Sequence, residues 1–75
     1  MEDRINKLED FTYDVLAKGG KKSIQLKDGT KFFASAQSNI LCIRVNGGEP
    51  RHVFRNDKQL CEKIRNIIST ELAHD

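Results

Sequence analysis

The side chains of this 75-residue sequence that could perform chemistry are two cysteines and two histidines. Cys42, His52, Cys61 and His74 follow one another at intervals of nine residues or more. Structural zinc sites pair their ligands about two to five residues apart, so this spacing predicts no metal site. Cys42 lies in an apolar run and Cys61 on an apolar helical stripe, where cysteine packs as a small hydrophobic residue. We expect His52 to be an ordinary strand residue and His74 to be solvated at a helix end.

The glycine pairs of the sequence do not form a phosphate-binding loop. Residues 47–50 read Gly-Gly-Glu-Pro, without the Lys-Ser/Thr that ends a P-loop. Gly19 and Gly20 precede two lysines, but they follow a helical pattern and are explained as its C-terminal cap. Without a positioned nucleophile, base or metal, the sequence predicts neither catalysis nor a cofactor. We therefore expect a protein that is not an enzyme.

Two amphipathic helices are expected near the ends of the chain. Residues 3–18 carry an apolar stripe at helical spacing, and Gly19 follows it. The second helix is expected to begin at Asn56, with Gln59 completing a capping box. The apolar positions are Ile5, Leu8, Phe11, Val15 and Leu16 in the first helix and Leu60, Cys61, Ile64, Ile67, Ile68 and Leu72 in the second.

A β-hairpin is predicted over residues 22–36, where polar and apolar residues alternate around an Asp-Gly turn. A two-residue loop would pair Ile24 with Phe33 and turn Phe33 toward the core. A three-residue loop with Gly29 left-handed pairs Ile24 with Phe32 instead. We favour this second register because it also turns the two following alanines toward the core. A slip of one residue would exchange the two faces of the hairpin.

Two more strands are expected after the hairpin. Residues 40–46 are apolar at nearly every position, which predicts a central strand covered at least in part on both faces. Residues 46–50 form the clearest loop, and residues 51–55 can return as a short fourth strand. The expected fold class is therefore α+β, a single domain over residues 1–75 with the order α-β-β-β-(β)-α. Both helices should pack on one face of the antiparallel meander, since both need an apolar surface to bury against.

Charge is distributed unevenly along the chain. Residues 1–17 hold two basic and five acidic side chains, a balance of −3, and residues 59–75 have a balance of −1. Residues 18–58 hold nine basic and three acidic side chains, a balance of +6. The expected helices are therefore acidic or neutral, and the expected sheet with its loops is strongly basic.

A sheet covered by helices on one face leaves its other face open. An open face with a basic rim and an apolar centre is typical of a binding surface. The residues expected to bind a partner there are Lys21, Lys22, Lys27, Lys31, Phe33, Arg44, Arg51 and Arg55. The apolar centre is expected to consist of Phe33, Ile40, Cys42 and Val53.

This surface predicts a small, non-catalytic binding or regulatory module. A basic face attracts an acidic protein, or one that handles nucleic acid, through the open sheet or an edge strand. Inhibitors encoded by phages and mobile elements have this layout. Residues 42–46, with the turn, short strand and helix that follow, resemble helix–meander–helix proteins that block CRISPR effectors. That resemblance implies an inhibitory contact with a protein.

Direct binding of nucleic acid is the alternative function. The α-β-β-β-α order resembles the topology of the double-stranded RNA-binding domain. The family's Gly-Pro-X-His loop between its first two strands is replaced here by residues 27–29, and its last-helix lysine cluster is reduced to Lys58 and Lys63. A single strand could instead stack a base on Phe33 and place its phosphates on the surrounding cations.

The remaining expectations concern association and location. A homodimer could bury the sheet face around Phe33. The first ten residues contain no apolar signal-peptide core, and no apolar run approaches the ~20 residues of a membrane span. Two cysteines 19 positions apart indicate a reducing compartment rather than a disulfide framework. We therefore expect a cytoplasmic protein with a protein partner, with nucleic acid as the alternative and no membrane contact.

Overall fold

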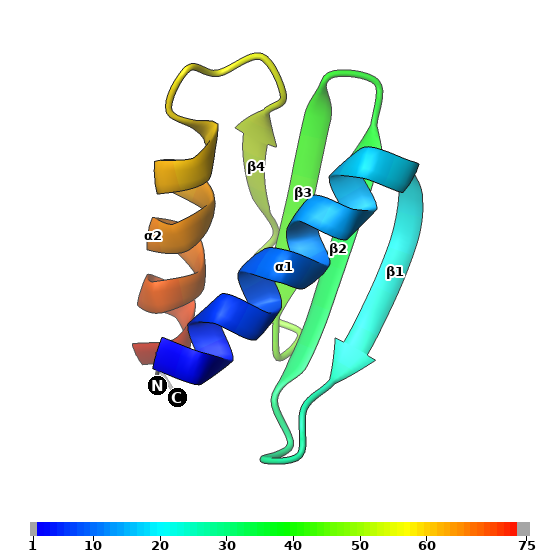
Figure 1. The fold of residues 1–75 in the computed structure, drawn as a ribbon. Coiled ribbons are helices and arrows are strands. Elements are labelled where there is room, and N and C mark those ends of the chain that lie inside the picture. The colour runs from blue at the N-terminus through cyan, green and yellow to red at the C-terminus, as the bar shows by residue number, and fades with distance from the viewer. Residues whose placement is uncertain (1, 74–75) are drawn as a thin grey trace.

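Two helices cover one face of a four-stranded antiparallel sheet (Figure 1). The computed structural model describes residues 2–73, so His74 lies outside the described residues. The elements are α1 (Glu2–Lys18), β1 (Gly20–Gln25), β2 (Lys31–Gln37), β3 (Ile40–Val45), β4 (Arg51–Phe54) and α2 (Leu60–Ala73). α1 packs across β1 and β2, whereas α2 packs beside β3 and β4. The predicted α+β class, the short fourth strand and the one-sided helices are confirmed.

The strands form a meander in which each strand pairs with the next, so β1 and β4 are the two edges. In the first hairpin Ile24 pairs with Phe32, the register favoured from the sequence. The Leu26 N–H donates to the Thr30 carbonyl at 2.8 Å, and the Gly29 N–H donates to the Leu26 carbonyl at 3.0 Å. Gly29 has a φ of +94°, a conformation that costs glycine little. This three-residue loop sets which side chains of β2 face the helices.

The core lies between the sheet and the two helices. Phe32 is 1% exposed, and the ring of Phe11 on α1 meets it edge to face, with ring centroids 5.8 Å apart. Other buried residues come from every element except β1: Ile5, Leu8, Val15 and Leu16 from α1, Ala34 and Ala36 from β2, Leu41, Ile43 and Val45 from β3, Val53 from β4, and Ile64, Ile68 and Leu72 from α2. The apolar residues spaced at helical intervals and those that alternate along the strands therefore pack together in one layer.

The helices bury one face of β3, and the expected partial cover of its other face is limited to Cys42, which is half-buried. Leu41, Ile43 and Val45 are buried, whereas Ile40 is 43% exposed and Arg44 is also exposed. Both helices lie on the same side of the sheet, so no element is left to cover the alternate residues of β3. The strand is thus apolar at positions on its open side as well as on its core side.

α2 begins later than its capping-box pattern indicated. The helix starts at Leu60, and the Asp57 side chain, rather than Asn56, accepts a hydrogen bond from the Gln59 N–H at 2.8 Å. Asp57 is also ion-paired with Lys63 in the first turn. Cys61, expected on the buried stripe, is exposed, because the helix directs Ile64, Ile68 and Leu72 at the sheet.

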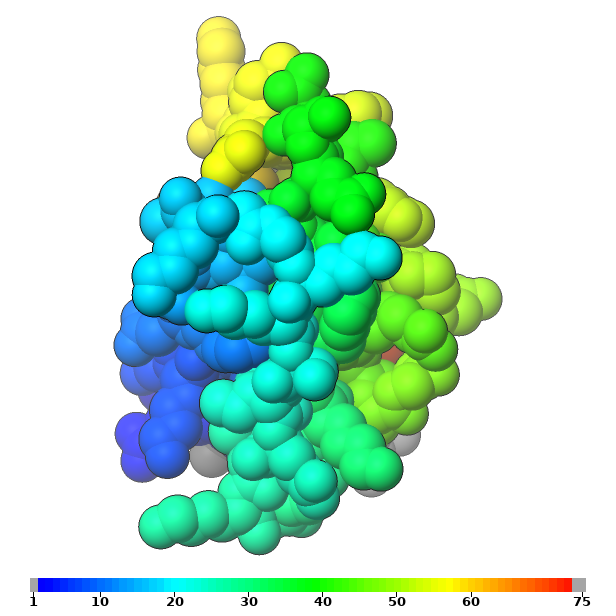
Figure 2. All heavy atoms as spheres, turned by 90° about the vertical axis from the view of Figure 1, so that its right-hand side faces the viewer, coloured from blue at the N-terminus to red at the C-terminus, as the bar shows by residue number. Residues whose placement is uncertain are grey.

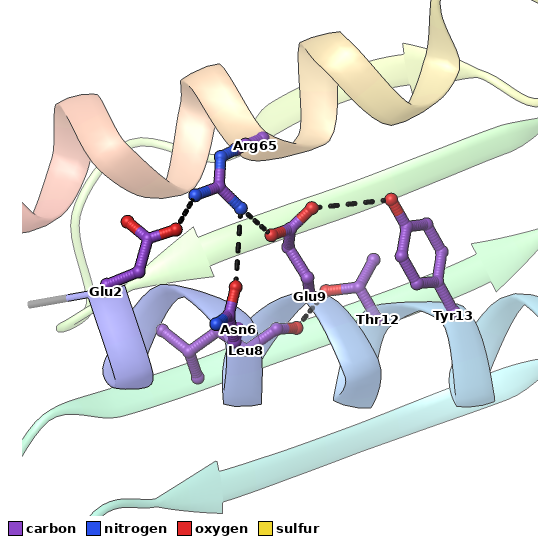
Figure 3. A network of polar contacts seen from close by, with 7 residues as sticks. All are labelled: Glu2, Asn6, Leu8, Glu9, Thr12, Tyr13 and Arg65. Atoms are coloured by element: carbon purple, nitrogen blue, oxygen red, sulfur yellow. Dashed lines mark hydrogen bonds and ion pairs between the residues drawn. The ribbon is translucent and has the colours of Figure 1, made fainter.

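The two helices are joined by a polar network centred on Arg65 of α2 (Figure 3). Its guanidinium donates to the carboxylates of Glu2 and Glu9 on α1, and to the Asn6 side chain at 3.4 Å. The Tyr13 hydroxyl donates to Glu9 at 3.5 Å. Burial, with Cys61 and Glu9 alongside, raises the pKa of Tyr13 to about 12, so the hydroxyl keeps its proton at neutral pH. This network fixes the helices against each other and uses two of the acids of α1.

A second polar cluster fastens the first hairpin to α1. The Asp28 carboxylate accepts the Thr30 N–H at 2.9 Å and pairs with the Arg4 guanidinium at 2.9 Å. Arg4 also donates to the Thr30 hydroxyl at 3.3 Å. These bonds, the Thr30 amide first, lower the pKa of Asp28 from 3.8 to about 2. The turn that sets the β2 register is thereby held by an ionised carboxylate.

Because the pKa of Asp28 is lower in the folded protein than in the unfolded chain, its stabilising effect is present above about pH 4 and is lost as the pH falls toward 2. We expect Asp28→Ser to lower the melting temperature at neutral pH and to match the wild type near pH 2. Thermal unfolding followed by circular dichroism between pH 2 and 7 measures this. Asp10→Ser, which removes an exposed carboxyl without a hydrogen bond or ion pair among residues 2–73, is the control. An equal difference in melting temperature between wild type and Asp28→Ser at every pH would contradict a stabilising role of the ionised Asp28 carboxylate.

Candidate functional site

The face of the sheet away from the helices, here called the open face, is defined by strand register. Residues paired across an antiparallel sheet point to the same side, and neighbours along a strand point to opposite sides. The open face therefore consists of Lys21, Ser23 and Gln25 of β1, Lys31, Phe33, Ser35 and Gln37 of β2, Ile40, Cys42 and Arg44 of β3, and His52 and Phe54 of β4.

The open face carries basic side chains and no acidic ones. Lys21, Lys31 and Arg44 belong to it, and the four strands contain no Asp or Glu. None of these three cations forms an ion pair with the described residues. The Arg44 guanidinium is held in place by the carbonyls of Gly47 and Gly48, each accepting at 3.0 Å. A positioned guanidinium with donors to spare is suited to a carboxylate or phosphate.

Most of the chain's other cations are already paired with acids. The ion pairs join Arg4 to Asp28, Lys18 and Lys22 to Asp14, Arg51 to Glu71, Lys63 to Asp57, and Arg65 to Glu2 and Glu9. Every acid in these pairs lies on a helix or in a loop. The three cations of the open face thus have no acidic partner among residues 2–73.

Apolar side chains share this face with the cations. Phe54 is 62% exposed and Ile40, which pairs with it, is 43% exposed. Phe33 is half-buried and lies between Ser23 and Arg44 in a cross-strand row. A shallow groove of about 420 Å³ runs along this row, lined by Ser23, Ile24, Gln25, Lys31, Phe32, Phe33, Arg44 and Gly47. The open face therefore offers one groove and, at the β4 end, one protruding apolar pair.

The residues of β4 that were expected on the open face lie on the helix side instead. This is the main correction to the predicted surface. Val53, expected at the apolar centre, pairs with Leu41 and is buried under the helices. Arg51 points to the same side and pairs with Glu71 of α2, Nε to Oε1 at 2.8 Å. Arg55 donates to the Leu16 carbonyl at the end of α1. Both arginines therefore contact helices and do not belong to the open face.

Two of the expected lysines also lie elsewhere. Lys22 pairs with Ala34 on the helix side of β1 and is ion-paired with Asp14 of α1, Nζ to Oδ2 at 3.6 Å. Lys27 lies in the hairpin loop, where it lines a separate depression with residues near the start of α1. Of the eight residues predicted to bind a partner, the structure brings together Lys21, Lys31, Phe33 and Arg44 on the open face.

His52 and Phe54 take the places predicted for the neighbouring residues of β4. His52 pairs with Cys42, and Phe54 pairs with Ile40, so both lie on the open face. Val53 and Phe54 must face opposite ways along the strand, but both are apolar, so the sequence does not indicate which of them faces the helices. The open face consequently has two phenylalanines and a histidine where one aromatic residue was predicted.

The described residues form no cluster of metal ligands. Among residues 2–73, no group of three or more His, Cys, Asp or Glu side chains is placed to hold a metal ion. Cys42 and Cys61 are free thiols on different sides of the molecule. Neither described helix is both long and apolar enough to cross a membrane. Comparison with family models, curated proteins and solved structures found no match to this chain.

Charge-reversal substitutions test which cations stabilise the fold and which belong to the open face without a structural role. We expect Arg51→Glu to lower the urea midpoint of unfolding, because it breaks the Glu71 pair and places two carboxylates together. Lys31→Glu, which changes the net charge equally, should shift stability by less than about 0.5 kcal/mol. Urea unfolding of both variants measures the difference. A loss from Lys31→Glu as large as that from Arg51→Glu would show that Lys31 has a structural role.

Proposed function

We propose that this chain is a non-catalytic binding module that docks an acidic protein surface on the open face. The observation that carries the proposal is the set of three cations, Lys21, Lys31 and Arg44, that have no carboxylate partner among the described residues. Stability alone does not require positive charge to be concentrated on an acid-free sheet, because like charges repel each other. An acidic partner would supply the missing counter-charge.

The mixture of charge and apolar area supports a protein partner. Interfaces are typically organised around buried aromatic and aliphatic anchors, with charges around them that steer association. Phe54 and Ile40 offer such an anchor, and Phe33 offers a second in the groove. Arg44 is held by two backbone carbonyls, so little side-chain freedom remains to be lost on binding.

Small inhibitors that act by occupying a protein surface fit this proposal. A domain of 75 residues without a predicted catalytic centre acts by contact, and the open face supplies the contact. We place the protein in the cytoplasm, where its two free cysteines would remain reduced. The target we propose has an acidic surface, such as a protein that handles nucleic acid and displays acids where nucleic acid binds.

Site-specific photo-crosslinking tests the proposal. A benzophenone amino acid in place of Phe54 should crosslink a protein in extracts of the source cell, whereas the same group in place of exposed Asn66 on α2 should not. The captured protein is then purified and titrated by calorimetry. Lys21→Glu/Lys31→Glu should weaken binding at least about tenfold, because it reverses two contacting charges.

The matched control is Lys7→Glu/Lys58→Glu, which has the same net charge and alters two exposed lysines outside the open face and without ion pairs among residues 2–73. It should bind like the wild type. Equal affinity of both double variants, or equal crosslinking from position 66, would contradict docking on the open face.

Binding of single-stranded nucleic acid is the second candidate function. The specific observation that favours it is the placement of Phe54 and His52 on the same acid-free face as Phe33. Stacking of successive bases on aromatic side chains beside cations is the usual mode of single-strand binding. Phe33 and Phe54 lie in different cross-strand rows, with the Cys42 row between them, so two bases could be held at separate places.

Fluorescence anisotropy with labelled single-stranded oligonucleotides tests this second candidate. Three phosphate contacts predict a slope of about −2 in log affinity against log salt concentration. Lys21→Glu/Lys31→Glu should abolish the binding, and Lys7→Glu/Lys58→Glu should leave the slope unchanged. Absence of binding at low salt would eliminate this function.

A further inference from the structure

The free edge of β1 is the most accessible backbone of the sheet. All six residues of β1 are exposed, and the strand forms hydrogen bonds to β2 on one side only. Figure 2 looks onto this edge, and no other segment of the chain lies over the strand there. The opposite edge is the four-residue β4, which α2 packs against. β1 is therefore the better edge for pairing with another strand.

The hydrogen-bond pattern identifies which backbone groups point outward. The Leu26 N–H donates to the Thr30 carbonyl, so Leu26 directs its backbone groups toward β2. In an antiparallel ladder Ile24, Lys22 and Gly20 then also bond to β2. The intervening residues are Lys21, Ser23 and Gln25. Their N–H and C=O groups point away from β2, and their side chains belong to the open face. A strand added at this edge would place its paired side chains on the open face as well.

The groove of the open face is open toward this edge. It runs from Ser23 to Arg44 with Phe33 between them. Ser23 is the smallest side chain of β1 apart from Gly20, so it leaves the Phe33 ring accessible from the edge. An apolar side chain opposite Ser23 in an added strand could lie across the serine onto Phe33.

Positive charge flanks the groove on both sides. Lys21 lies two residues from Ser23 along β1, and Lys31 pairs with Gln25 two residues away in the other direction. Neither lysine has an ion-pair partner within residues 2–73. Acids two residues before and after the apolar side chain would therefore meet Lys21 and Lys31. A second copy of β1 has lysines and no acids, so its charges do not complement this edge.

We propose that β1 binds an extended acidic segment of a protein partner as a fifth strand, with the pattern acid–x–apolar–x–acid directed at the open face. Backbone hydrogen bonds to Lys21, Ser23 and Gln25 provide the pairing, and the Phe33 groove and two lysines select the side chains. This inference rests on the proposed function and specifies the chemistry of the partner.

A synthetic peptide of seven residues tests the proposal with the intact protein. It carries glutamate at its second and sixth positions, phenylalanine at its fourth and threonine elsewhere. A control peptide has the same composition with phenylalanine moved to the third position, on the other face. Titration followed by 15N NMR should show binding of the first peptide at least about tenfold tighter than that of the control. On binding, exchange of the Lys21, Ser23 and Gln25 amide protons should slow, because they enter hydrogen bonds.

N-methylated peptides test the backbone contacts directly. Methylation of the fourth amide removes a donor that faces β1 and should abolish binding, whereas methylation of the fifth amide, which faces away, should have no effect. Equal effects of the two methyl groups, or no protection of the three amides, would overturn strand addition. A concentration-dependent dimer in sedimentation, with β1 amides protected in the absence of peptide, would also overturn it.

Ser23→Pro separates this inference from the proposed function. Proline removes the outward N–H of Ser23, a position where an edge strand tolerates it, and leaves the open-face cations unchanged. Its fold is checked by the NMR spectrum. Loss of peptide binding in both Ser23→Pro and Lys21→Glu/Lys31→Glu supports strand addition. Loss of binding of the captured partner only in the lysine variant would retain docking on the open face and reject the added strand.

Discussion

The register of the first hairpin is the constraint on which the other features depend. Gly29 takes a left-handed conformation, and the bond from the Leu26 N–H to the Thr30 carbonyl closes a loop of three residues. This register turns Phe32 into the core against Phe11 and leaves Phe33 on the open face. A slip of one residue would exchange the two rings and every other side chain of the hairpin. The core, the groove and the outward amides of β1 are all consequences of the same turn.

The distribution of acids explains how the protein can hold a basic face and still fold. Glu2 and Glu9 of α1 pair with Arg65, which joins the helices. Asp14 of α1 and Glu71 of α2 pair with Lys22 and Arg51 on the helix side of the sheet. Asp28 similarly binds Arg4 at the end of the hairpin. These pairs stabilise the arrangement of the elements, but no acid remains within the strands. The ion pairs that stabilise the fold and the cations of the open face are therefore separate sets of residues.

Much of the fold could be predicted because its determinants are local. Glycine after an apolar helical stripe ends α1, and alternation around Asp28-Gly29 produces the hairpin. The predicted start of α2 was wrong because Asp57, and not Asn56, accepts the capping hydrogen bond. The prediction of which β4 residues face outward was wrong. Val53 and Phe54 are adjacent and both apolar, so either of them could have faced the core of a four-residue strand. Arg51 consequently lies off the open face. Lys22, Lys27 and Arg55 also lie off it, but none of the three is part of β4.

The sequence by itself determined the types and order of the elements and a set of strands without acids, because these follow from spacing and composition. Only the tertiary structure decided which cations face outward. Arg51 is neutralised by Glu71, twenty residues away in the sequence, and Arg55 reaches the end of α1. Such pairings depend on how α2 and β4 pack together, which no local pattern encodes. The same packing buried Val53 and placed Phe54 and His52 beside the cations of the open face.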